Sequence, residues 1–121
     1  MGCDIHMHVE CKKRGKWVLH SEDIYDGRNY ELFSILAGVR GSSTPISYPK
    51  GLPVDVTDDV KSLYDSWEWD AHSASWLTFN EIYNSRFDYD NISLQHIALD
   101  MLSSKIDQKA EDVRIVFWFD S

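Results

Sequence analysis

The chain has 121 residues, of which 43% are hydrophobic, and this is enough to bury the core of one small domain. Its formal net charge is -8, with 20 acidic against 12 basic residues, which argues against a nucleic-acid-binding protein because phosphate contacts need basic patches. Because neither a long apolar stretch nor a secretory signal is evident, we expect a soluble, cytoplasmic protein with a single domain over residues 1–121.

Residues 3–11 alternate between apolar and polar side chains, which is typical of a β-strand with one buried face. The polar face would carry Asp4, His6, His8 and Glu10. Cys3 and Cys11 lie on the apolar face, about 26 Å apart at ~3.3 Å per residue, so they cannot form a disulfide and suit a reducing compartment. Residues 16–20 follow a turn that contains Gly15 and predict an antiparallel partner strand.

The middle of the chain predicts several short helices. One helix ends at Gly38, a typical terminator, and another begins at Thr57, which is followed by two aspartates that favour a helix start. Thr78 and Glu81 have the spacing of a capping box. The predicted helices cover residues 29–37, 57–67 and 92–106, with a further helix starting at Thr78.

The chain closes on residues 113–120, a β-branched and aromatic run that predicts a buried strand. Two strongly apolar strands in a small domain should share one sheet, so we expect this strand to pair with residues 3–11. Residues 67–76, which are rich in tryptophan, are interpreted as a loop that enters a helix. The predicted class is α+β, a small antiparallel sheet including the N- and C-terminal strands, packed against three or four short helices.

The polar stripe of the first strand has the residue types and spacing of a metal site. Side chains two apart on a strand share a face, with Cα atoms about 6.6 Å apart, so neighbouring members of the stripe can converge on one ion. Imidazole nitrogen and carboxylate oxygen suit zinc and other divalent metals. A second Asp-x-His pair follows in the tryptophan-rich stretch, and an aspartate ends the last strand. We predict a divalent metal, zinc first, with candidate ligands Asp4, His6, His8, Asp70, His72 and Asp120. A solvent-facing strand that binds nothing is the alternative.

Residues 55–71 hold six acidic residues against one lysine, whereas residues 1–20 are net basic. Acidic side chains suit a basic partner, and tryptophan is enriched in binding hot spots. A solvated surface, with the tryptophans packed in the core, explains the same pattern. The predicted partner-binding residues are Asp55, Asp58, Asp59, Asp65, Trp67, Glu68 and Trp69.

Several motifs occur in a fixed order along nearly the whole chain. They are Gly2-Cys3-Asp4-Ile5-His6, Arg28-Asn29-Tyr30, Leu36-Ala37-Gly38-Val39-Arg40, Pro49-Lys50-Gly51-Leu52-Pro53, Asp70-Ala71-His72-Ser73, Ser75-Trp76-Leu77-Thr78 and the run from Val113 to Asp120. This set resembles a family of small proteins encoded by bacteriophages and prophages. The chain is also similar in type to metal-containing anti-CRISPR proteins that inhibit the type II RNA-guided nuclease.

The resemblance implies a binding protein that acts in the host cell cytosol. Its acidic surface would occupy a basic patch of the host CRISPR effector nuclease that otherwise holds guide RNA or target DNA, without itself binding nucleic acid or a membrane. Two alternatives stay open. One is a metal-dependent hydrolase or phosphoesterase that uses Asp4, His6 and His72. The other is a phage structural or regulatory protein with an empty histidine strand. We favour a binding protein over an enzyme.

Overall fold

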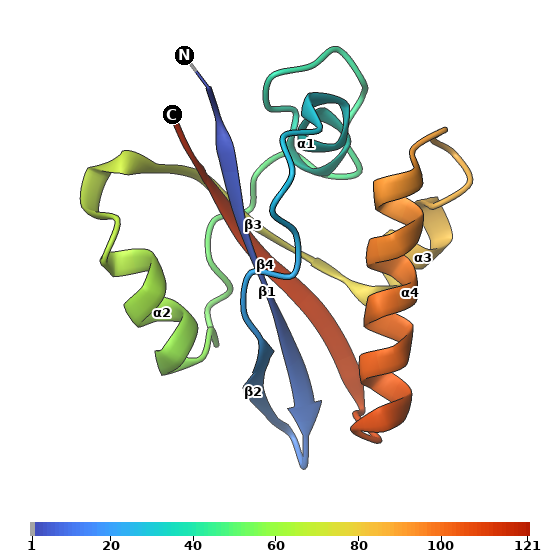
Figure 1. Cartoon of the computed structure of the whole chain (residues 1–121). Coiled ribbons are helices and arrows are strands. Elements are labelled where there is room, and N and C mark those ends of the chain that lie inside the picture. Colours follow the sequence, from blue (N-terminus) through green and yellow to red (C-terminus); the bar gives the residue numbers. More distant parts are fainter. Residues whose placement is uncertain (1) are drawn as a thin grey trace.

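The computed structural model describes residues 2–121 and is built around a four-stranded antiparallel sheet in the order β2-β1-β4-β3 (Figure 1). The strands are β1 (Asp4–Lys13), β2 (Lys16–Ser21), β3 (Ala71–Thr78) and β4 (Asp112–Asp120). Asp4 lies opposite Asp120, and Lys12 lies opposite Asp112. The predicted pairing of the N- and C-terminal strands is therefore confirmed, and it places both ends of the chain side by side (Figure 1).

Helices cover both faces of the sheet. Over residues 2–121 they are α1 (Tyr30–Ala37), α2 (Asp58–Asp65), the short 3-10 helix η1 (Glu68–Asp70), α3 (Phe79–Ser85) and α4 (Ile92–Asp107). In Figure 1, α2 lies on one side of the sheet, while α1, α3 and α4 lie on the other. The predicted α+β class is confirmed. Within the described part of the chain, no helix has the length and apolar character needed to cross a membrane.

Each face of the sheet has its own hydrophobic core. Side chains alternate between the two faces along β1 and β4. Met7, Phe119 and the residues that share their face pack in a large core against α1, α3 and α4. The opposite face of β4 contributes Val116 and Trp118 to a smaller core, which Val60 of α2 completes. The polar stripe of β1 belongs to this second face, so α2 and its flanking segments cover part of it.

The helix ends follow the local signals of the sequence. The Asn29 side chain caps α1 at its start, and Gly38 ends it in the left-handed conformation with φ 72°. Thr57 caps α2. The capping box is confirmed at α3, where Thr78 and Glu81 satisfy each other's backbone N–H groups.

Residues 71–78 correct one prediction, because they form the edge strand β3 and not a loop. The register with β4 shifts between His72 and Ser75, and Ser73 has a φ of 55°. This irregularity and the run of small polar residues hide the alternation by which a strand is recognised in a sequence. The outer edge of β3 is covered in part, since Gly51 donates its N–H to the carbonyl of Ala74 at 2.9 Å.

Candidate functional site

Three of the predicted metal ligands line one pocket where β1 begins and β4 ends. His6 Nε2 lies 2.5 Å from Asp120 Oδ2, and Asp4 lies directly opposite Asp120 in the sheet. Arg28 donates to the two carboxylate oxygens of Asp4, with distances of 2.7 Å from Nε to Oδ1 and 3.1 Å from Nη2 to Oδ2. This hydrogen bond lowers the pKa of the Asp4 carboxyl. Each of the two facing carboxylates thus has its own basic partner.

A pocket of about 360 Å³ opens beside this pair. Its lining comes from β1, from β4, from residues 23, 25, 26 and 27 after β2, and from Trp67. The Trp67 ring packs on the His6 imidazole with 4.2 Å between ring centroids. The lining is acidic and aromatic, so the pocket suits a cationic group better than a phosphate.

His8 lies one step further along the same face but is only 2% exposed. Its Nδ1 accepts a hydrogen bond from the backbone N–H of Asp23 at 3.1 Å, so the ring proton is on Nε2. Burial lowers the pKa of His8 and keeps the ring neutral. Within residues 2–121 the His8 Nε2 has no hydrogen-bond partner. His8 holds the segment at Asp23 against β1, and the structure does not place it in the pocket.

The second Asp-x-His pair lies elsewhere. His72 is opposite Phe119 in the sheet, so it faces the large core side, away from His6. Its Nε2 lies 2.9 Å from Ser121 Oγ and its Nδ1 lies 3.0 Å from Ser73 Oγ. Asp70 is exposed at the end of η1. Across residues 2–121, no group of three or more His, Cys, Asp or Glu side chains is arranged to hold a metal ion, and the metal site stays a prediction.

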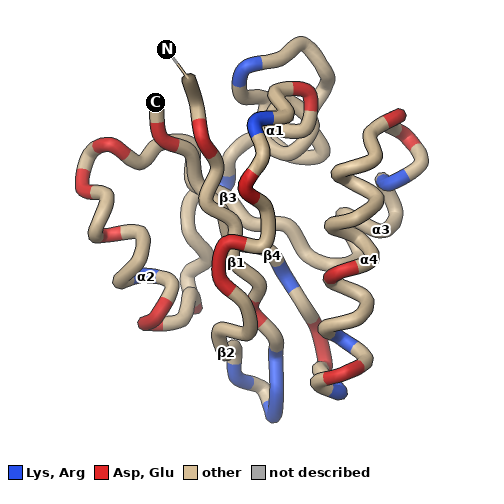
Figure 2. The backbone as a smooth tube through the Cα atoms, in the orientation of Figure 1, with Lys and Arg blue, Asp and Glu red and all other residues tan. Residues whose placement is uncertain are grey.

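Five of the seven predicted partner-binding residues form an exposed stretch of α2 and η1. We call it the α2 surface, and it consists of Asp58, Asp59, Asp65, Glu68 and Trp69, all of which are exposed. Figure 2 shows acidic residues along α2 and the turn after it, whereas basic residues gather at the tip of the β1–β2 hairpin. Trp69 is 87% exposed. Trp67 is half-buried in the smaller core, and the Asp55 carboxylate binds Arg114 at 2.8 Å.

A buried ion pair fixes the start of this surface, and sequence reasoning missed it. Arg114 Nε donates to Glu10 Oε1 at 2.6 Å, and these side chains are 3% and 0% exposed. The other Glu10 oxygen accepts the backbone N–H of Thr57 at 2.9 Å, and Trp17 packs on the guanidinium with 3.9 Å from Cζ to the ring centroid. The signal was present, because Arg114 interrupts an apolar strand at a position that faces the polar stripe of β1.

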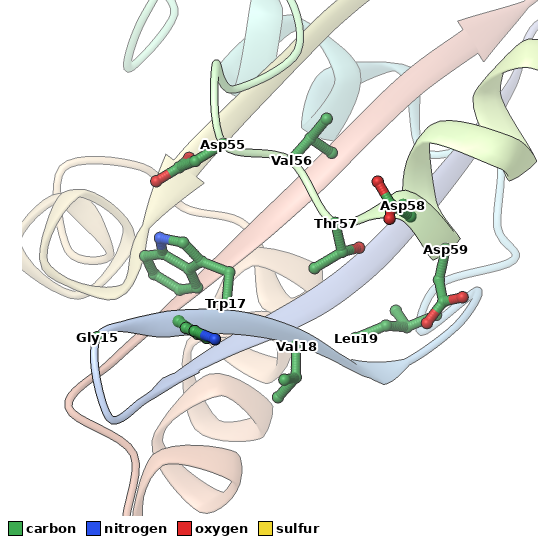
Figure 3. A pocket seen from close by; sticks show the side chains of 10 residues that line it. Gly15, Trp17, Val18, Leu19, Asp55, Val56, Thr57, Asp58 and Asp59 are labelled. Atoms are coloured by element: carbon green, nitrogen blue, oxygen red, sulfur yellow. The ribbon is translucent and has the colours of Figure 1, made fainter.

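A second hollow, of about 620 Å³, lies between β2 and the segment that leads into α2 (Figure 3). Trp17, Val18 and Leu19 come from the strand, and residues 55–59 form the opposite wall. This hollow and the pocket beside His6 lie next to different parts of the α2 segment.

These features define an α+β protein whose antiparallel sheet carries helices on both faces and an acidic surface on one of them. Comparison with protein-family models, with curated proteins and with solved structures found no match.

Proposed function

We propose that the protein is a phage-encoded inhibitor of a host RNA-guided nuclease, of the anti-CRISPR type, which binds the nuclease and blocks loading of nucleic acid. The observation that carries this proposal is the α2 surface, where exposed carboxylates lie on the same segment of the chain as a tryptophan that is 87% exposed. Nucleic-acid channels of such nucleases are positively charged. An acidic face is complementary to that channel.

The α2 surface keeps its charge exposed. Lys61 Nζ binds Asp65 at 2.7 Å, but both side chains are more than half exposed, so this pair is weak and breaks at little cost. The remaining carboxylates attract a basic partner and speed its encounter. Trp69 does not belong to either hydrophobic core of residues 2–121, so its ring is available to fill a pocket on the partner.

The substitution Trp69→Ala tests the surface. We expect it to weaken binding to a purified type II nuclease by about 30-fold, since a hot-spot tryptophan contributes about 2 kcal/mol. Calorimetric titration measures the affinity, and a DNA-loading assay measures the block. Phe87→Ala is the matched control, because Phe87 is 77% exposed and lies outside the α2 surface. Failure of the wild-type protein to bind, or equal losses in the two variants, contradicts the proposal.

We also propose that a divalent ion binds beside His6 and Asp120, with zinc as the leading candidate. Elemental analysis is expected to find the metal in purified protein, and a chelator is expected to lower the melting temperature because a bound ion stabilises the folded state. His6→Ala should lose the metal, whereas His20→Ala, which changes an exposed histidine on β2, should keep it. If the purified protein contains no metal and neither zinc nor a chelator changes its melting temperature, the metal proposal is wrong.

A metal-dependent hydrolase or phosphoesterase is the second candidate function, because a cation held in the acidic pocket beside His6 would in turn bind a phosphate. Asp4, His6 and Asp120 line that pocket, whereas His72, which the sequence suggested for the same role, faces the other side of the sheet. Turnover of bis(p-nitrophenyl) phosphate that is lost with a chelator and in His6→Ala would favour this function. Nuclease binding without turnover favours the inhibitor.

A further inference from the structure

The outer edge of β2 is an open sheet edge. β2 is the first strand in the sheet order and pairs with β1 alone. A two-residue turn joins the two strands, with φ values of 52° at Arg14 and 76° at Gly15, as in the type I′ hairpin. In such a hairpin the residues that flank the turn exchange hydrogen bonds, and every second residue after them does the same.

That rule assigns the backbone groups of β2. Lys16 and Val18 bond to β1, so the N–H and C=O groups of Trp17 and Leu19 point away from the sheet. Within residues 2–121 no backbone hydrogen bond from another segment reaches Trp17 or Leu19. The opposite edge differs, because the loop at Lys50 and Gly51 bonds to β3.

The 620 Å³ hollow lies beside this edge, and its lining determines which side chains an added strand would contact. Trp17 and Leu19 are half-buried, and their side chains line this hollow. Figure 3 shows Asp58 and Asp59 at the start of α2, across from Leu19. Trp17, Val18 and Leu19 carry no charge, so the lysine of this strand, a residue type that opposes strand addition, is confined to its first position at Lys16.

We propose that an extended segment of the partner protein adds to β2 as a further strand and places lysine or arginine side chains against Asp58 and Asp59. This inference rests on the proposed function and names its mode of contact. Main-chain hydrogen bonds to Trp17 and Leu19 provide affinity, and the aspartates select a basic segment. The basic tip of the hairpin, with Lys16 and its neighbours (Figure 2), directs the cations of the segment toward the Leu19 end.

The probe is the synthetic peptide Thr-Val-Lys-Val-Arg-Val-Thr, whose two cations share one face when it is extended. Hydrogen exchange of the backbone amides, followed by NMR, reports on the edge. When the peptide occupies about nine-tenths of the protein, the Trp17 and Leu19 amides are expected to exchange about tenfold more slowly. The Val18 amide, which already bonds to β1, serves as the internal control.

Charge selection has its own controls. A peptide with glutamate in place of lysine and arginine should not bind, and the double substitution Asp58→Asn and Asp59→Asn should weaken binding of the basic peptide. Peptide binding that leaves the Trp17 and Leu19 amides unchanged overturns strand addition, as does an absence of binding. Slow exchange of these amides in the protein alone, together with a dimer by sedimentation, makes a second copy the occupant and also overturns it.

The complex with the nuclease separates this inference from the proposed function. If the nuclease binds and the Trp17 and Leu19 amides still exchange at the rate of the unbound protein, strand addition is wrong and the inhibitor proposal stands. If the peptide protects these amides and no nuclease binds, the edge is a peptide site and the inhibitor proposal is wrong.

Discussion

Replacement of Arg114 by methionine is expected to lower the free energy of unfolding by about 3–5 kcal/mol. Arg114 is 3% exposed and binds Glu10, which is 0% exposed. Methionine fills much of the same space but removes the guanidinium, so the Glu10 carboxylate loses its charge partner inside the protein. Such an isolated buried charge costs far more than the loss of an exposed pair. Urea unfolding of wild-type and variant protein measures the difference.

The exposed pair of α2 provides the control. Lys61→Met removes the Lys61–Asp65 pair, in which both side chains are more than half exposed, and we expect a loss of at most about 0.5 kcal/mol. The double substitution Glu10→Gln with Arg114→Met should recover part of the loss, because it removes the orphaned charge as well. Equal effects of Arg114→Met and Lys61→Met would refute the account of a buried, interdependent pair.

The same ion pair links the sheet to the α2 surface. Glu10 accepts the Thr57 N–H at 2.9 Å, and Arg114 holds Asp55 at 2.8 Å, so residues 55–57 are attached to the strands at the point where α2 begins. The hollow beside β2 has this segment as one wall. The same buried ion pair therefore holds the segment that begins α2 and contacts the Trp17 side chain at the edge of β2.

Local signals in the sequence were enough to predict most of the fold. These signals are the alternation in β1, the apolar run of β4, Gly38 after α1 and the capping box at Thr78. Each acts within a few residues, so it can be recognised without knowledge of the tertiary structure. β3 was missed for the opposite reason. Its register shift and the left-handed Ser73 break the alternation, and its strand character comes from pairing with β4.

The candidate site was predictable only as far as the strand pairing was. Once β1 pairs with β4, Asp4, His6 and Asp120 must share one end of one face. The position of His72 depends on the register of β3, and this register sends the ring to the opposite face. The burial of His8 depends on how residues 21–27 and α2 cover β1. Both are long-range features without a local signal.

Replacement of Phe33 by alanine is expected to lower the free energy of unfolding by about 3–5 kcal/mol, because it leaves a cavity in the larger core. Phe33 is 0% exposed and packs edge-on against Phe119, with 5.2 Å between ring centroids. Phe87→Ala, which truncates a ring that is 77% exposed, should change stability by about 0.5 kcal/mol or less. Comparable losses in the two variants would contradict this assignment of the core.

Phe33→Ala also tests how α1 supports the candidate site. α1 begins two residues after Arg28, and the Tyr30 hydroxyl accepts the Cys3 N–H at 3.0 Å. Looser packing of α1 should weaken the hydrogen bonds from Arg28 to Asp4. Because the Arg28 hydrogen bond lowers the pKa of Asp4, that pKa should rise toward its ordinary value in an NMR titration of the folded variant. If stability falls while the pKa of Asp4 stays low, Arg28 is positioned by its own segment and the packing of α1 serves the core alone.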